Sequence, residues 1–168
     1  MSIRLKKFSY RYAEEVLNSK LIIKDEIEEI IYNSTSDLSI LSRPEFNTIL
    51  EKEFQKKGWL CQPQVFGNDD DAYAKFDFMK NRIGVEVQFG HSSFLGIDLL
   101  KFQVASYSGS DSIDFGIYIT TTAAFQKYMQ NNFDLKWSGS LSFEKVTRYL
   151  PLFRSAIQVP IYVIGIDI

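Results

Sequence analysis

The amino-acid sequence predicts an α/β fold in which a mixed central β-sheet is flanked by helices. Helical and strand-like hydrophobic patterns alternate along the chain. The passage from a strand at 83–89 through a helix to a strand at 113–121 favours a parallel crossover, whereas the short gap after 74–79 favours an antiparallel hairpin. The chain has 168 residues, 45% of them hydrophobic, which is enough for one ordinary core. We therefore expect residues 1–168 to form a single domain.

Two amphipathic helices are expected in the first third of the chain. The segment Ile22–Tyr32 places Ile23, Ile27, Ile30 and Ile31 on one stripe and acidic residues off it. A second helix is expected to begin near Ser42 and Pro44 and to stop at Gly58, because serine caps helices, proline suits the first turn and glycine ends them. Its inward residues would be Phe46, Ile49, Leu50 and Phe54.

Three short strands are expected to follow these helices. They are Trp59–Phe66, Ala74–Met79 and Ile83–Phe89, with a polar loop at 67–71 and a hairpin turn at 80–82. The remaining expected elements are a helix at 94–107, a strand at 113–121, helices at 123–131 and 142–157, and a final strand at 159–166.

The composition restricts the classes of site and location. One cysteine, Cys61, and one histidine, His91, cannot form an internal disulfide or a structural zinc site. Any bound metal should therefore be held by oxygen ligands. The N-terminal residues lack a secretory signal, and no apolar run is long enough to cross a bilayer, so we expect a cytoplasmic protein with no membrane partner.

The net charge of −2 disfavours a protein that coats nucleic acid without specificity. It does not disfavour an enzyme that gathers positive charge in one cleft, because the field that matters there is local.

The segment 75–89 contains the residues with the clearest chemistry. Side chains alternate along a strand, so Glu86 and Gln88 share one face, and Asp77 on the partner strand can lie opposite Glu86. Two carboxylates and an amide oxygen at the end of a sheet suit a hard divalent cation such as magnesium. Such a cation can activate water and polarise a phosphate, which implies phosphodiester hydrolysis. The commoner explanation for an acidic residue in a strand is the solvated face of a half-buried sheet.

The run from Asp77 to Gly90, DFMKNRIGVEVQFG, continues to Ser93-Phe94 and Asp98-Leu99. It resembles the active-site segment of the BglII/BstYI-like type II restriction endonucleases of the PD-(D/E)xK superfamily. Glu-Val-Gln-Phe at 86–89 matches this branch, whereas most of the class has Glu-x-Lys. Further similarity lies at Asn47, 57–59, 114–116 and 160–165, and the resemblance covers the chain from about Ile22 onward.

The resemblance implies a restriction-endonuclease-like core and assigns roles to residues of the segment. Asp77 and Glu86 would bind Mg²⁺, which Mn²⁺ could replace, and the main-chain carbonyl of Val87 would be a further ligand. Gln88 would orient the attacking water in the place of the usual lysine. Gln62 is the nearest candidate for an upstream polar residue that positions the same water.

Two loops are candidates for contacts with DNA bases, because hydroxyl and imidazole groups can read base edges. The first contains Gly90, His91, Ser92 and Ser93, and the second contains Thr120, Thr121 and Thr122. The alternatives are that the serines cap the following helix, that His91 is a plain surface residue and that the threonines reflect strand propensity. His91, Ser92 and Asp98 could also suggest a nucleophilic triad, although no Gly-x-Ser-x-Gly elbow is present.

Basic residues near the hairpin could contact phosphates, although isolated lysines near a turn are usually just solvated. They are Lys75, Lys80, Arg82 and Lys101.

The leading hypothesis is a homodimeric enzyme that cuts both strands of double-stranded DNA at a short palindromic site. The resemblance implies a GATC-centred site and 5′ overhangs, and a two-fold protein matches two-fold DNA most simply. The helix at 94–107, with part of 142–157, would form the interface. The alternatives are a structure-specific repair or junction nuclease and a DNA-binding protein with a vestigial metal site.

Overall fold

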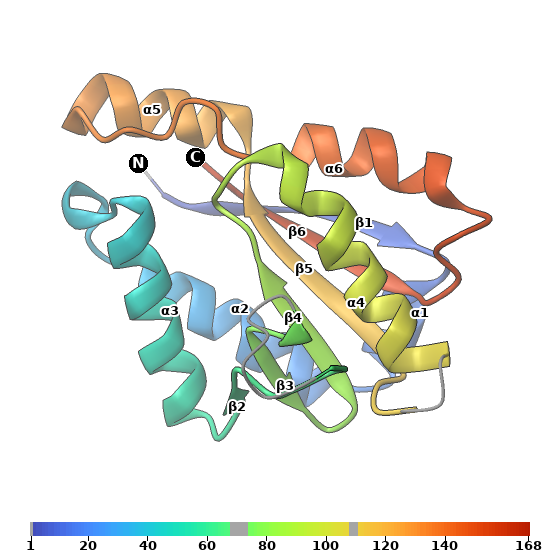
Figure 1. Cartoon of the computed structure of the whole chain (residues 1–168). Helices are drawn as coiled ribbons and strands as arrows, with labels where there is room; N and C mark the ends of the chain where they lie inside the picture. Colours follow the sequence, from blue (N-terminus) through green and yellow to red (C-terminus); the bar gives the residue numbers. More distant parts are fainter. Residues whose placement is uncertain (1, 68–73, 108–110) are drawn as a thin grey trace.

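A computed structural model describes residues 2–67, 74–107 and 111–168. Within these residues the strands form one six-stranded sheet in the order β1-β6-β5-β4-β3-β2 (Figure 1). The strands are β1 (Arg4–Tyr10), β2 (Leu60–Cys61), β3 (Phe78–Lys80), β4 (Ile83–Val87), β5 (Phe115–Thr121) and β6 (Ile161–Asp167). The three central strands β4, β5 and β6 are parallel, and the outer pairs are antiparallel. The predicted mixed sheet is confirmed.

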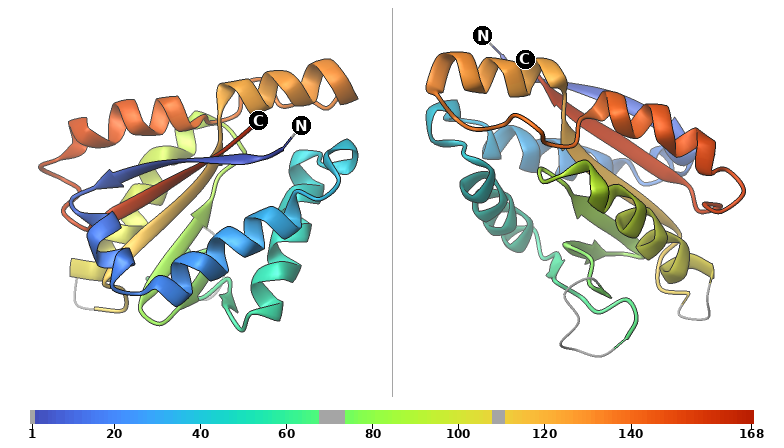
Figure 2. Two further views of the ribbon diagram at one scale, coloured as in Figure 1. Left: turned by 180° about the vertical axis from the view of Figure 1, so that it is seen from behind. Right: turned by 45° about the horizontal axis from the view of Figure 1, so that its top comes forward.

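Helices cover both faces of this sheet. They are α1 (Ala13–Asn18), α2 (Leu21–Ser34), α3 (Arg43–Lys56), α4 (Leu95–Tyr107), α5 (Ala123–Phe133) and α6 (Phe143–Tyr149), with short 3₁₀ turns η1 (Leu38–Ile40), η3 (Ser92–Phe94) and η4 (Leu150–Phe153). Residues of α1, α2, α3 and α5 share one hydrophobic cluster, and those of α4, α6 and η4 share the other. Figure 2 shows α2 and α3 on the side of the sheet opposite α4. No helix within the described ranges is long and apolar enough to span a membrane.

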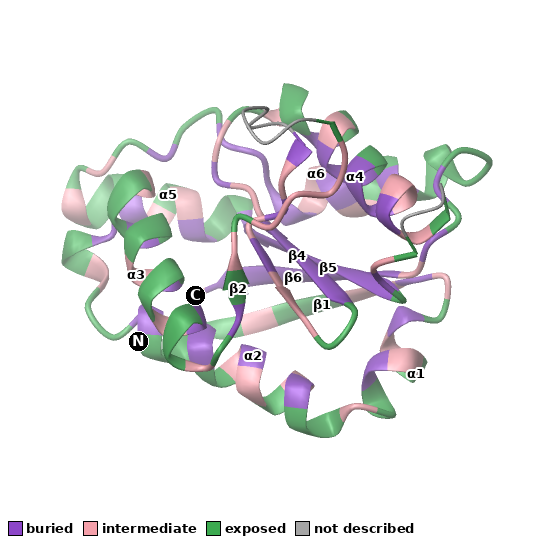
Figure 3. Ribbon diagram, turned by 60° about the horizontal axis from the view of Figure 1, so that its bottom comes forward, coloured by how far each residue is buried: buried purple, intermediate pink, exposed green. Residues whose placement is uncertain are grey.

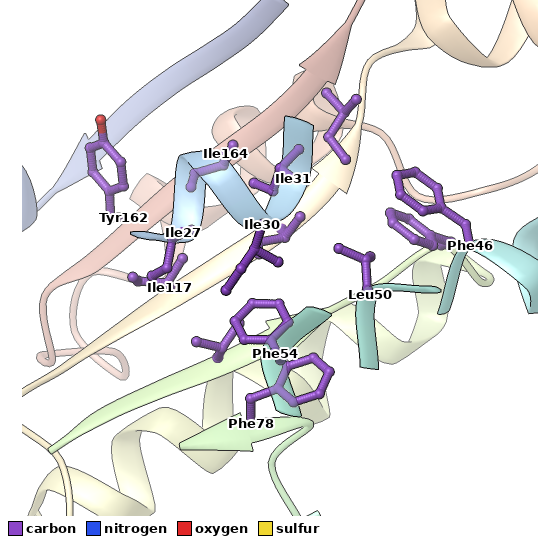
Figure 4. Close-up of a cluster of buried hydrophobic side chains, with 14 of the residues drawn as sticks. Ile27, Ile30, Ile31, Phe46, Leu50, Phe54, Phe78, Ile117, Tyr162 and Ile164 are labelled. Carbon is purple, nitrogen blue, oxygen red and sulfur yellow. The ribbon is translucent and has the colours of Figure 1, made fainter. Parts of the chain in front are cut away.

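The two predicted N-terminal helices form as expected. In α2 the four isoleucines of the predicted stripe are buried. In α3 the Ser42 side chain accepts a hydrogen bond from the Glu45 amide, and Gly58 follows the helix with φ of 76°. Phe46, Leu50 and Phe54 are buried and Ile49 is half-buried. Figure 4 shows Phe46, Leu50 and Phe54 of α3 beside Ile27, Ile30 and Ile31 of α2, packed against the sheet.

Several predicted ends of strands and helices are wrong. Most of these errors lie at residues that interrupt backbone hydrogen bonding. The strand expected at 59–66 is reduced to β2 because Gln62 has a positive φ of 53° and Pro63 has no amide to donate. The strand expected at 74–79 begins only at Phe78. The helix expected at 142–157 ends at Tyr149 and continues as η4, which contains Pro151. Most of the loop expected at 67–71 lies outside the described residues.

The sequence patterns did not predict β1 and α1. β1 pairs along its whole length with β6 at the edge of the sheet, and its mixture of exposed and half-buried residues shows no regular alternation. Figure 3 shows the contrast between this edge and the buried central strands β4, β5 and β6. An edge strand buries too little apolar surface to produce a clear period in the sequence.

One close contact determines how near α4 lies to the sheet. A side-chain carbon at Gly116 of β5 would approach the Phe102 ring of α4 to 2.4 Å, which is closer than van der Waals contact allows. Glycine at this position therefore lets Phe102 pack against the strand. The same approach brings the polar residues of α4 to the face of β4 that contains Glu86.

Candidate active site

The hairpin of β3 and β4 brings Asp77 and Glu86 together. Its turn residues Asn81 and Arg82 both have positive φ, 49° and 63°, as in the two-residue turns that match the twist of paired strands. Phe78 pairs with Val85, so Asp77 and Glu86 occupy the next position of the register. Asp77 Oδ2 accepts a hydrogen bond of 2.7 Å from the amide of Val87. The predicted proximity of the two carboxylates is confirmed.

Glu86 is a buried carboxylate with an incomplete set of partners. Its exposed fraction is 3%. Lys101 Nζ lies 2.7 Å from Glu86 Oε1 in an ion pair, but the geometry is not that of a hydrogen bond, and among the described groups Oε1 has no other partner. A buried anionic oxygen needs a compensating positive charge, and among the described groups the Lys101 ammonium provides it.

The burial of the carboxylates changes their proton affinities. Desolvation raises the pKa of Glu86 well above its ordinary range, and the charge of Asp77 raises it further, while Lys101 lowers it. Desolvation also raises the pKa of Asp77, against the hydrogen bond from Val87, which lowers it. Both carboxyl groups therefore hold a proton more tightly than an exposed carboxyl group does.

Gln88 belongs to a hydrogen-bonded group that links β4, α4 and β5. Its Nε2 donates to Asp98 Oδ2 over 3.0 Å, and its Oε1 accepts from the Gly90 amide over 2.8 Å. The hydroxyl of Tyr118 donates to the same Asp98 oxygen over 2.9 Å. Gln88 is therefore held in one orientation on the face that also contains Glu86.

From the sequence, Lys101 was expected only as one of four basic residues that could contact phosphates, Asp98 appeared only in the resemblance and the triad, and Tyr118 was not singled out. Asp98 and Lys101 are three residues apart on α4, and Lys101 Nζ lies 3.3 Å from Asp98 Oδ1. Tyr118 is the register partner of Glu86. The sequence did contain a signal for Asp98 and Lys101. A helix that connects two parallel strands by a right-handed crossover lies on one defined face of the sheet. Its polar residues at a spacing of three would then face that strand.

Gln62 lies beside Asp77, as its expected role requires. Its amide donates to the main-chain oxygen of Asp77 over 3.0 Å, and its side-chain Nε2 approaches Asp77 Oδ1 to 3.3 Å. Both residues line a small pocket of about 200 Å³ that also includes Asn47 and Val87. A second, open pocket of about 290 Å³ is lined by Asp77, Glu86, Val87, Gln88, Phe94, Ile97, Asp98 and Lys101.

The two loops expected to contact bases differ in the structure. His91 and Ser93 are exposed and Ser92 is half-buried. His91 Nδ1 lies 3.0 Å from the Ser93 hydroxyl and accepts from the Ser93 amide, so His91, rather than a serine, caps η3. Asp98 is occupied by Gln88, Tyr118 and Lys101. The structure therefore does not assemble the triad of His91, Ser92 and Asp98.

The structure contradicts the prediction that the threonine loop contacts DNA bases. Thr120, Thr121 and Thr122 are fully buried. The Thr120 hydroxyl lies within hydrogen-bond distance of the carbonyls of Gln88 and Leu141. Thr121 accepts from Gln126, and Thr122 caps α5 and donates to Asp167. These hydroxyls have partners inside the protein, so we do not retain the three threonines as base contacts.

Of the basic residues near the hairpin, Lys80 and Arg82 form ion pairs away from the pocket, whereas Lys101 lines it. Lys80 Nζ bonds Glu26 of α2 over 2.8 Å, on the α2 and α3 side of the sheet. Arg82 pairs with Asp111 and Asp114 at the turn. Lys101 lines the pocket with Glu86. Of the lysines with a described ion pair, Lys101 is the one that contacts the site.

The fit of a metal ion can be tested on these residues. In the described parts of the chain, no group of three or more His, Cys, Asp or Glu residues is placed to hold a metal ion. The protein would therefore supply the Asp77 and Glu86 carboxylates and a main-chain carbonyl, with water or phosphate completing the coordination, as hard cations commonly allow. Glu86 Oε1, which accepts no hydrogen bond from the described groups, fits this arrangement.

Comparison with known proteins agrees with the sequence resemblance. The profile of the family described as "Restriction endonuclease BglII/BglIII" matches residues 5–166, so the similarity begins earlier than the expected Ile22 and includes β1 and α1. A solved structure, restriction endonuclease BglII complexed with a DNA 16-mer, superimposes with a TM-score of 0.71 and 22% sequence identity, covering 98% of this chain and 78% of that chain. A search of curated proteins found no match.

Proposed function

The chain belongs to the BglII/BglIII family of restriction endonucleases, and from this premise we propose that it cuts a short palindromic, GATC-centred site in double-stranded DNA and leaves 5′ overhangs. Mg²⁺ is the proposed cofactor, with Mn²⁺ as a substitute. Residues 1–168 would act as one catalytic domain in the cytoplasm.

The observation that supports a metal-dependent reaction is the pair of carboxylates on the β3–β4 hairpin, the half-buried Asp77 and the buried Glu86. Asp77 is fixed by the Val87 amide, and Glu86 has an oxygen without a hydrogen-bond partner among the described residues. Asp77, Glu86 and the carbonyl of Val87 would hold the ion. When bound, a divalent ion in such a site lowers the pKa of water and offsets negative charge on the phosphate.

Gln88 and Gln62 are proposed to position the attacking water. An amide side chain has two N–H groups and two acceptor lone pairs. In Gln88 one of each is used by Asp98 and Gly90, which leaves one N–H and one lone pair to orient a water. Gln62 approaches the other side of Asp77 and would limit where that water can move.

The loop of Gly90, His91, Ser92 and Ser93 is the proposed base-reading segment. It follows β4 directly, and the exposed His91 and Ser93 side chains have polar atoms at the surface. The Leu141 amide donates to the Gly90 carbonyl over 2.7 Å, and His91 bridges Ser140. These contacts hold the base of the loop, so its tip would meet the DNA in a defined position.

A second copy of the chain is the proposed partner at α4 and η4. Leu100, Leu152 and Phe153 are large apolar residues that are exposed by 47%, 72% and 42%. Leu100 and Phe153 line an apolar groove of about 230 Å³ together with Gly96, Leu99, Ala156 and Ile157. Exposed apolar surface of this kind marks an interaction site, and a two-fold dimer would present two active sites to a palindrome.

The direct test is digestion of a sequenced phage genome with the purified protein, followed by mapping of the fragment ends. Discrete ends at a palindrome, produced only with magnesium or manganese, would support the proposal. Ends set by DNA structure would instead indicate a repair nuclease, and binding without cutting would indicate a vestigial site. Sedimentation tests the dimer separately, and a monomer both free and on its duplex site would contradict it.

A further inference from the structure

Lys101 is a buried lysine whose ammonium group lies among carboxylates. Its residue is 6% exposed, although lysine is almost never buried without a reason. Its Nζ lies 2.7 Å from Glu86 Oε1 and 3.3 Å from Asp98 Oδ1, and it donates to the Lys75 carbonyl over 3.1 Å. The ammonium is therefore fixed from three sides.

The element that carries Lys101 is itself held firmly against the sheet. Phe102, the next residue, packs on Gly116, and Asp98, one turn earlier, accepts a hydrogen bond from the Tyr118 hydroxyl in β5. Both contacts fix the rotation of α4 about its axis. The position of the ammonium is thus set by the fold and not by a flexible surface side chain.

The excess of carboxyl groups in the pocket indicates a role for Lys101 toward an anionic substrate. Asp77, Glu86 and Asp98 contribute three carboxyl groups to the pocket, against one ammonium from Lys101. A phosphodiester that enters is also an anion, and its charge spreads over the phosphoryl oxygens as the water attacks. Gln88, which stands where the resemblance places a lysine, is neutral and can offer only hydrogen bonds.

We propose that Lys101 is a catalytic residue that contacts the scissile phosphate and supplies, from α4, the positive charge that β4 lacks. This proposal rests on the proposed function. In the step it assists, the water oxygen forms a bond to phosphorus while the bond from phosphorus to the departing oxygen breaks. The water loses one proton to solvent and the departing oxygen gains one, so only water is consumed. The ammonium remains charged and stabilises the phosphoryl oxygens throughout.

A purely structural role makes the opposite prediction. If Lys101 only neutralised Glu86 and Asp98 in the metal-free protein, its removal would free Glu86 for a divalent ion. The cleavage rate at saturating metal would then be unchanged or higher. If Lys101 contacts the phosphate, its removal lowers that rate however much metal is present.

The first test measures single-turnover cleavage at saturating magnesium in Lys101→Met, which keeps the aliphatic stem, and in Lys101→Gln, which keeps a hydrogen-bond donor for the carboxylates. We expect each to lose about 100-fold or more, as for other positioned catalytic groups. The matched control is Lys80→Met, because Lys80 is also ion-paired but lies on the opposite side of the sheet. It should keep the wild-type rate.

The second test moves the positive charge from position 101 to position 88. Gln88→Lys in the Lys101→Met background returns a cation to the same pocket from the strand, and we expect it to recover at least about 10-fold of the lost rate. Thermal unfolding of each variant, compared with wild type, identifies any loss that comes from the fold.

The third test needs neither metal nor cleavage. Binding of the mapped site is measured in EDTA with a normal duplex and with one whose scissile phosphate is a neutral methylphosphonate. The effect of this change on affinity should differ by about 10-fold between wild type and Lys101→Met, the size of a 1.4 kcal/mol contact. Equal effects, or single-turnover rates within about threefold of wild type in both Lys101 variants, would overturn the proposal. Wild-type protein that neither binds nor cuts DNA would instead contradict the proposed function.

Discussion

The two faces of the sheet are built on different principles. The face covered by α2 and α3 is filled with aromatic and aliphatic side chains, whereas the face covered by α4 and α6 combines a second hydrophobic cluster with the buried charged groups of Glu86, Asp98 and Lys101 near the end of β4. The first face gains stability from every residue it buries. The second retains groups that are costly to bury. The difference indicates that the α2 and α3 side supplies stability alone, whereas the α4 side combines a hydrophobic cluster with the groups for chemistry.

The apolar face is closely packed. The rings of Phe54 and Phe78 stack with centroids 4.0 Å apart, and those of Phe46 and Phe89 stack at 4.8 Å. Trp137 contacts Phe89 edge-on at 5.4 Å. Stacked and edge-on pairs of this kind add to the free energy gained from burial, and they hold β3 and β4 from the side opposite the site.

The largest expected effect concerns the polar face. Asp77→Ala and Glu86→Ala should abolish cleavage, by about 10⁴-fold or more, because each removes one of the two carboxylates that would hold the metal. Specific binding in calcium should remain largely intact. Single-turnover cleavage and gel-shift binding measure the two properties, and substantial cleavage by either variant would exclude the proposed metal site.

The next effect concerns the apolar face. Phe54→Ala should lower the free energy of unfolding by about 3–5 kcal/mol, because Phe54 of α3 is fully buried against Phe78 of β3 and Trp59. The matched control is Tyr32→Ala, since Tyr32 is a 46% exposed aromatic residue of α2. Urea unfolding should separate the two clearly. A similar small loss in both would mean that the apolar face does not supply the stability assigned to it.

The patterned residues of these faces could be predicted from the sequence, because their burial is one-sided. The isoleucine stripe of α2, the inward residues of α3 and the alternation of β4 were all predicted. The contact of Lys101 with Glu86 was only partly predictable. The crossover indicates which face of the sheet α4 covers, but not the rotation of α4 about its axis, which decides which of its side chains reach Glu86. The threonines at 120–122 were misjudged because β5 is buried on both faces, so alternation no longer identifies a solvent side.

A smaller effect is expected for Gln88, whose side chain is hydrogen-bonded to Asp98 of α4 and to the Gly90 amide. Gln88→Ala should reduce cleavage by about 100-fold or more. The attacking water would lose the side chain that orients it, and Asp98 would lose a hydrogen-bond donor. Gln88→Glu should keep measurable activity with an altered preference between magnesium and manganese, since a third carboxylate is a good ligand for either. Metal titrations of the single-turnover rate check both variants, and near-normal cleavage by Gln88→Ala would remove its proposed role.

The smallest effect tests the comparison most directly, because it measures whether the polar face costs stability until a metal binds. The raised pKa of Glu86 means that the folded protein holds this proton more tightly than the unfolded chain does. Its contribution to stability therefore falls as the pH rises above the ordinary pKa of a glutamate, about 4.3. Glu86→Gln removes the charge and should stabilise the metal-free protein at neutral and higher pH, with no gain in acid.

The measurement is thermal unfolding of wild type and Glu86→Gln at about pH 8, in EDTA and with millimolar manganese. In EDTA, Glu86→Gln should melt about 3 °C higher than wild type, the shift expected for roughly 1 kcal/mol in a chain of this size. Manganese should raise the midpoint of wild type and have a smaller effect on Glu86→Gln. A variant that is no more stable than wild type in EDTA, together with equal shifts in manganese, would contradict the account.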